Sequence, residues 1–126
     1  MSVEIAIVAA LSTHPPLVAL TGGRVYNNQL PEQTSGKLPC VVYELVAAPS
    51  VQTATGAIVC SMPRFQFRIW AEKAASGISA EKPFKDALLT LWGTYEVQFL
   101  DSEDDIDPTT QLWWRRYDVR FIANGY

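Results

Sequence analysis

Two amphipathic stretches of the chain constrain its fold more than any other feature. In the range 58–70, Phe65, Phe67 and Ile69 alternate with arginine and glutamine. In the range 113–121, alternate residues again define one face. Because successive side chains of a strand point to opposite sides, each stretch predicts a strand with one buried and one polar face. Such strands need a covering layer on one side of their sheet.

Helical spacing predicts that covering layer. An N-terminal helix begins at Ser2, which can cap it, and ends at residues 13–16, where proline removes a backbone donor. A second helix begins with Ser79 as its cap and ends at Gly93. Both helices have an apolar face, made of Val3, Ile5, Ile7, Val8, Ala10 and Leu11 in the first and of Phe84, Ala87, Leu88, Leu91 and Trp92 in the second.

Shorter elements and polar loops fill the remaining segments. A brief helical turn through residues 17–20 ends at Gly22-Gly23, where glycine supplies the positive φ. Arg24–Asn27 and Cys40–Ala47 predict strands, the second opened by Pro39. Residues 28–37 between them are polar and rich in turn formers, which predicts a mobile loop. Residues 49–56 predict a second loop or a hairpin tip.

The order of these elements predicts the fold class. Asp101–Thr110 is interpreted as a hairpin loop between a strand that begins at Tyr95 and the last strand. Strands joined by short turns favour an antiparallel sheet with the helices on one face. We therefore predict an α+β fold, a single mostly antiparallel β-sheet with an N-terminal helix and a second helix packed on it, ending in a β-hairpin. With 126 residues and no internal repeat or linker, residues 1–126 are interpreted as one domain.

The composition argues against several classes of protein. A formal net charge of −3 opposes binding to nucleic acid by phosphate neutralisation. Arginines interleaved with aromatic residues could form a surface on which nucleic-acid bases stack. The simpler interpretation is that they form the solvent-exposed face of an amphipathic sheet. These arginines are Arg64, Arg68, Arg115, Arg116 and Arg120. Only 18% of the residues are charged, which leaves surface for another subunit to cover.

The N-terminus and the cysteines indicate where the protein is made. Glu4 and the lack of a basic region make the N-terminus a poor signal peptide. No apolar run approaches the about 20 residues that span a bilayer. Cys40 and Cys60 both fall in predicted strands, where cysteine usually behaves as a small buried hydrophobe. We expect a cytoplasmic protein without a disulfide framework.

Catalytic and metal sites find little support. The acidic run of residues 101–107 could hold calcium, but Ile106 stands where the turn glycine is needed and Leu112 where the closing glutamate is needed. Alternatively, the acidic run has no metal and forms a solvated hairpin tip, or a tip that pairs with Arg115, Arg116 or a neighbouring subunit. His14 is the only histidine and sits at a helix end, so a Cys–His pair is the less favoured interpretation. We expect no catalytic residue, no cofactor and no metal.

The tryptophans leave two alternatives open. Trp113 and Trp114 are neighbours on a strand and therefore point to opposite faces. Trp70 falls on the face opposite to Phe67 and Ile69. Either a helix or loop of the same subunit covers these rings, or they belong to an interface, where exposed aromatics beside arginines are common.

In its order of motifs the chain resembles the tail-completion, or tail-terminator, family of long-tailed bacteriophages. The resemblance covers nearly the whole chain and rests on the order of individually weak motifs. They are the N-terminal helix, Val18-Ala19-Leu20-Thr21-Gly22-Gly23-Arg24-Val25-Tyr26, Leu38-Pro39-Cys40-Val41-Val42-Tyr43-Glu44, Arg64-Phe65-Gln66-Phe67-Arg68-Ile69-Trp70 with the helix that follows it, and Tyr117-Asp118-Val119-Arg120-Phe121.

This resemblance implies a structural virion protein without catalytic residues. Subunits of the family form a sixfold ring on the head-proximal end of the tail tube, as in siphoviruses, ending its polymerisation and meeting the head connector. It also implies a location in the virion tail or neck after assembly in the bacterial cytoplasm. The alternatives are another neck or head–tail joining protein of the same particle and, from a different class, a small α+β ligand-binding domain.

The partners implied are further copies of the chain, the tail tube protein and the connector; genomic DNA only passes through the lumen, and no membrane is involved. Mobile loops on a rigid sheet commonly carry binding, so residues 28–37 and 101–110 are the expected partner-facing loops. The interface candidates are Asn28, Gln29, Leu30, Glu32, Gln33, Lys37, Trp70, Asp104, Asp105, Trp114 and Arg116.

Overall fold

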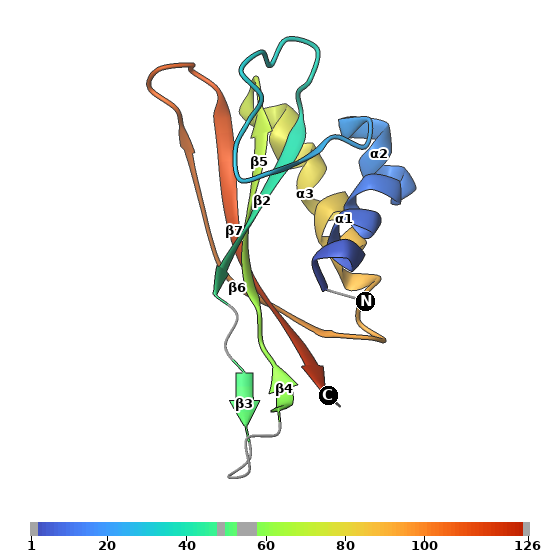
Figure 1. Cartoon of the computed structure of the whole chain (residues 1–126). Coiled ribbons are helices and arrows are strands. Elements are labelled where there is room, and N and C mark those ends of the chain that lie inside the picture. Colours follow the sequence, from blue (N-terminus) through green and yellow to red (C-terminus); the bar gives the residue numbers. More distant parts are fainter. Residues whose placement is uncertain (1–2, 48–49, 53–57, 125–126) are drawn as a thin grey trace.

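The computed structural model describes residues 3–47, 50–52 and 58–124, which form a sheet with helices on one side (Figure 1). Within these ranges no single helix is long and apolar enough to cross a membrane; only α1 and α2 together reach that length, and they are bent by 72° at their junction. The elements are α1 Val3–Thr13, α2 Pro15–Thr21, β1 Val25–Asn27, β2 Cys40–Ala47, β3 Ser50–Gln52, β4 Ile58–Ser61, β5 Arg64–Ala71, α3 Ala74–Leu89, β6 Glu96–Ile106 and β7 Trp113–Asn124.

The main sheet has the strand order β1–β2–β5–β7–β6. Its strands pair antiparallel, except that β1 runs parallel to β2, with Val25 opposite Val41. The predicted α+β fold with a C-terminal β-hairpin is confirmed, and the sheet is mixed rather than purely antiparallel. The parallel pair is possible because residues 28–39 give the chain enough length to return to the same end of the sheet.

The stretch predicted as one strand over residues 58–70 is divided at Met62–Pro63 into β4 and β5. Both parts nevertheless pair with β7 in one register, with Ser61 opposite Ala123 and Arg64 opposite Arg120. Pro63 has no N–H to donate, but its carbonyl accepts a hydrogen bond from the Phe121 amide at 2.9 Å. β3 pairs with β4, so a two-stranded arm extends beyond the body of the sheet (Figure 1).

Two expectations lie partly or wholly outside the described residues. The predicted loop of residues 49–56 is described only at 50–52, which form β3. The capping role predicted for Ser2 falls outside the described ranges, and of Cys60 only the backbone is described.

The core lies between the sheet and the helices (Figure 1). Phe84 of α3 is central to it, with its ring centroid 5.4 Å from that of Phe67 and 5.0 Å from that of Tyr117. Such edge-to-face and offset contacts favour one arrangement of the rings over others. Alternate residues of β5 are fully covered, as predicted. Ile5 was expected to widen the buried stripe of α1 and does not, since 60% of its surface is exposed.

Helix α3 begins five residues before Ser79, so the predicted cap is wrong. Ser79 lies inside the helix, and its hydroxyl donates to the carbonyl of Ala75 at 2.9 Å. Gly77 is buried in the first turns, where it faces the ring of Trp113 without a side chain in between. The helix ends at Leu89, and a turn that includes Gly93 leads from it to β6.

Candidate functional site

The side of the sheet opposite the helices, called the open face below, carries a pair of aromatic rings. Trp70 of β5 and Trp114 of β7 are register partners, and their ring centroids are 6.3 Å apart. The guanidinium carbon of Arg68 lies 5.2 Å from the centroid of Trp114, which is cation–π distance. Both tryptophans are half-buried, whereas Trp113 points to the helices and is only 5% exposed. The predicted division of the two adjacent tryptophans between opposite faces is confirmed.

Arginines line the open face beside the two rings and farther along the same strands. Arg64 is opposite Arg120 and Arg68 is opposite Arg116 in the β5–β7 register. Arg116 donates to Asp101 at 3.3 Å and lies 3.8 Å from Glu103. The other three have no carboxylate within ion-pair distance in the part of the chain that the structure describes.

The acidic run was expected in a loop, and that expectation is wrong for most of it. Strand β6 continues to Ile106, so the connection to β7 comprises only residues 107–112. A bulge between Phe99 and Asp101 shifts the register and places Glu103 opposite Arg116 and Asp104 opposite Arg115. These opposite-charge pairs across the strands keep acidic residues in a β-ladder that their low strand propensity would disfavour.

The alternation of β6 divides its acids between the two faces. Asp105 is opposite Trp114 and lies on the open face, whereas Asp104 lies on the helix side. Among the described residues, no group of three or more histidine, cysteine, aspartate or glutamate side chains is gathered where it could hold a metal ion.

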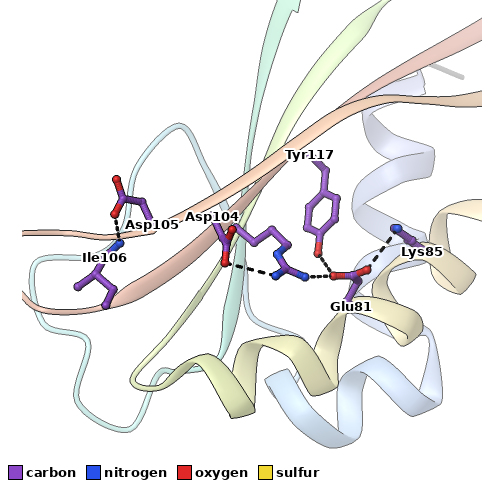
Figure 2. A network of polar contacts seen from close by, with 7 residues as sticks. Glu81, Lys85, Asp104, Asp105, Ile106 and Tyr117 are labelled. Atoms are coloured by element: carbon purple, nitrogen blue, oxygen red, sulfur yellow. Dashed lines mark hydrogen bonds and ion pairs between the residues drawn. The ribbon is translucent and has the colours of Figure 1, made fainter.

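On the helix side, a network of charges ties α3 to β7 and β6 (Figure 2). The carboxylate of Glu81 accepts hydrogen bonds from Tyr117 at 2.9 Å, from Lys85 at 3.4 Å and from Arg115. Arg115 also donates to Asp104 at 3.3 Å. The network therefore fixes the acidic strand against the helix.

The network shifts the pKa values of its members. Partial burial alone would raise the pKa of Glu81, but the hydrogen bonds from Tyr117 and Arg115 and the charge of Lys85 outweigh it and lower that pKa. Burial raises the pKa of Tyr117, and its hydrogen bond to the anionic Glu81 raises it further. Glu81 is thus held as a carboxylate and Tyr117 as a neutral donor at neutral pH.

The loop of residues 28–37 is fixed at both ends. At its start, the amide of Asn28 donates to the carbonyl of Tyr43 at 2.8 Å. At its end, Arg24 donates to the carbonyls of Lys37 at 2.9 Å and Pro39 at 3.2 Å. Gly22 and Gly23, with φ of 66° and 79°, direct the chain toward Arg24, as the sequence predicted.

The same region buries Cys40. Burial raises the pKa of its thiol to about 12, and the nearby charge of Arg24 opposes this shift only in part. Cys40 therefore behaves as a small apolar residue, as expected for a cysteine in a strand.

Comparison with known proteins identifies the family of this fold. The family model described as "Tail completion protein gp17" matches residues 5–124. The chain belongs to the tail completion protein gp17 family. The resemblance inferred from the order of its motifs is confirmed, and membership makes this gp17-family protein a structural component of a phage tail.

A solved structure shares the fold of this gp17-family protein. It is a chain of the "Virion of native gene transfer agent (GTA) particle", with a TM-score of 0.69, 16% sequence identity and coverage of 98% of this chain and 96% of that chain. At this identity the likeness shows the fold. No curated protein matches the chain.

The fold of the gp17-family protein brings some of the interface candidates together and separates others. Trp70, Trp114, Arg116 and Asp105 share the open face, and Asp104 lies behind it. The loop candidates belong to the β1–β2 connection, at the sheet edge opposite to β6. The exposed ones are Asn28, Gln29, Glu32 and Gln33, and the half-buried ones are Leu30 and Lys37.

Sequence reasoning missed the Glu81 network of the gp17-family protein. Glu81 and Lys85 are spaced i,i+4 on a helix, a signal that predicts only a weak surface pair. Their contacts with Arg115 and Tyr117 span more than 30 residues of sequence.

Proposed function

We propose that the protein closes the head-proximal end of the tail tube as a ring, ends tube polymerisation and offers the surface that joins the head connector. Family membership over residues 5–124 carries this proposal. Its partners are the tail tube protein, the connector or neck protein and further copies of the chain, in a ring that we propose to be a hexamer of a siphovirus-type tail. The ring assembles in the bacterial cytoplasm, and genomic DNA passes its lumen without specific binding.

Two surfaces at different places on the sheet support a role that needs several partners. The open face offers half-buried tryptophans beside arginines, a composition that is enriched at protein interfaces. The loop of residues 28–37 offers exposed polar side chains at the sheet edge opposite to β6. Hydrogen bonds hold both ends of this loop in place. We assign the loop to the tail tube or the connector and the open face to contacts within the ring.

Electron microscopy of tails made with and without the protein tests the proposal. Overlong tails in its absence support termination, because an uncapped tube continues to grow. Tails of normal length that fail to join heads would instead assign the protein to the other neck role, that of a head–tail joining protein. Normal, joined and infectious particles in its absence would contradict both roles.

Substitution of the loop tests its assignment separately. Gln29, Glu32 and Gln33 are exposed, so changing all three to alanine should leave the protein folded and abolish tail completion. Glu72→Ala with Lys73→Ala, two exposed positions directly before α3, is the control. Infectious particles at the normal yield with the triple variant would show that these loop side chains are not needed.

A further inference from the structure

The open face holds like charges in direct opposition. Arg64 is opposite Arg120, and Arg68 is opposite Arg116, across the β5–β7 pair. Like charges at directly opposed positions of antiparallel strands destabilise a sheet. Two carboxylates relieve Arg116, yet its Nε is buried without a hydrogen-bond partner among the described residues. The other arginines have no counter-charge of their own in the described ranges.

The aromatic pair lies at one end of this row of arginines. Trp70 and Trp114 are neither buried in the core nor fully exposed, and Arg68 stacks on one of them. Tryptophan and arginine are the residue types that most often carry the binding energy of an interface. The surface of Arg64, Arg68, Arg120, Trp70 and Trp114, called the arginine–tryptophan face below, is thus suited to a partner that brings carboxylates.

The chain itself offers such a surface at one sheet edge. β6 pairs only with β7 among the described strands, and its residues from Phe99 to Ile106 are all exposed. Glu103 has 57% of its side chain exposed, and Asp105 is exposed beside it on the open-face side. Unpaired edges invite association with another chain, and charged side chains restrict which partner can approach. The part of β6 around Glu103 and Asp105 is called the acidic edge below.

We propose that the acidic edge of one copy packs against the arginine–tryptophan face of the next copy. This inference rests on the proposed ring. We propose that the contact is head-to-tail, the type of contact that can close into a ring.

Nucleic acid is the competing occupant, and the surroundings of the face disfavour it. Asp118 lies between Arg116 and Arg120 on β7, and Glu44 is opposite Gln66 on the β2 side. These carboxylates would repel phosphates, as would the net charge of −3. The acidic edge of a second copy, in which carboxylates are interspersed with apolar and polar residues, fits the arginine–tryptophan face better than nucleic acid does.

Paired charge reversals test the contact. Arg68→Glu with Arg120→Glu reverses the face, and Glu103→Lys with Asp105→Lys reverses the edge. The mass of each variant is measured by light scattering after size exclusion, alone and after addition to purified tails, and thermal unfolding checks that it is folded. Lys73→Glu with Lys82→Glu, and Glu72→Lys with Asp86→Lys, apply the same charge changes on α3 and in the bend before it as controls.

Wild type and controls should assemble, while each reversed variant should remain at the monomer mass of 14.0 kDa. An equimolar mixture of the two reversed variants should assemble again. In such a mixture, alternating copies bring opposite charges together at every contact. Assembly of the wild type should also weaken with salt.

Several outcomes would overturn this inference. Reversed variants that assemble like wild type, or a mixture that stays monomeric, would show that the contact lies elsewhere, while the proposed function stands if tails are still completed. A wild type that assembles neither alone nor on tails would remove the ring and the contact together. Retention of DNA on nitrocellulose by wild type but not by Arg68→Glu with Arg120→Glu would assign the face to nucleic acid.

Discussion

Replacement of Gly77 by alanine separates local helix propensity from tertiary packing. Alanine stabilises a helix interior by about 1 kcal/mol relative to glycine, so propensity alone predicts a more stable protein. A Cβ at Gly77 would overlap three ring atoms of Trp113, of which the farthest is 2.9 Å away. Carbon atoms pack at about 3.5–4.0 Å, so the overlap is severe.

The ring of Trp113 cannot easily move away. It is 5% exposed and belongs to the core, and Arg115 stacks on it with its guanidinium carbon 5.3 Å from the ring centroid. Overpacking costs about 1–3 kcal/mol. With three ring atoms involved we take the upper end, subtract the gain in propensity, and expect Gly77→Ala to lower the free energy of unfolding by about 2 kcal/mol. The melting temperature should fall by roughly 8 °C.

Urea denaturation measured for a double-mutant cycle tests this reasoning. In a Trp113→Leu background the ring is absent, so Gly77→Ala should no longer destabilise the protein and should be neutral or stabilising. Ser79→Ala, at an exposed position of the same helix, is the control and should change stability by less than about 0.5 kcal/mol. A Gly77→Ala protein that is more stable than wild type in the Trp113 background would refute the packing argument.

Three further predictions concern the charged and buried groups. The lowered pKa of Glu81 means that its stabilising contribution is present above the unfolded-state pKa of about 4.3 and is lost as the pH falls through the lower folded-state value. Unfolding free energies measured from pH 7 to pH 2 should therefore decline less steeply for Glu81→Gln than for wild type, and equal slopes would contradict the assignment. In a Cys60→Ser variant, Cys40 should resist a thiol reagent at pH 8 until the protein is unfolded, because burial raises the pKa of its thiol to about 12. Rapid modification of the native protein would contradict this expectation. Arg24→Ala removes the two hydrogen bonds that the guanidinium donates to the carbonyls of Lys37 and Pro39. The free energy of unfolding should fall by about 1–3 kcal/mol, and proteolysis of residues 28–37 should increase. Unchanged proteolysis would show that other contacts hold the loop.

The sequence predicted well those features that repeat along a strand. The alternation in the ranges 58–70 and 113–121 identified the buried faces of β5 and β7, and placed Trp114 on the side away from the core. Cys40–Ala47 has its predicted bounds. These properties depend on a period of two, which any strand covered on one side must obey.

Features set by partners far along the chain could not be predicted in the same way. The acids of residues 101–106 read as a loop by composition, and only their pairing with Arg115 and Arg116 makes them a strand. The bulge at Leu100 decides which acid meets which arginine, and no local signal marks it. Similarly, the first turns of α3 lie against Trp113 at Gly77, a contact across more than 30 residues.

The position of β7 in the sheet has a consequence for the synthesis of the protein. It pairs with β5, β6 and β4, all of which precede it in the chain, and it supplies Trp114 and Arg120 to the open face. Chains emerge from the ribosome N-terminus first, so this surface is complete only after translation of the range 113–124. A polypeptide that stops before Trp113 lacks the strand that joins β5, β6 and β4, and two of the five residues of the arginine–tryptophan face. With the contact proposed above, a prematurely terminated chain cannot join a second copy through this face.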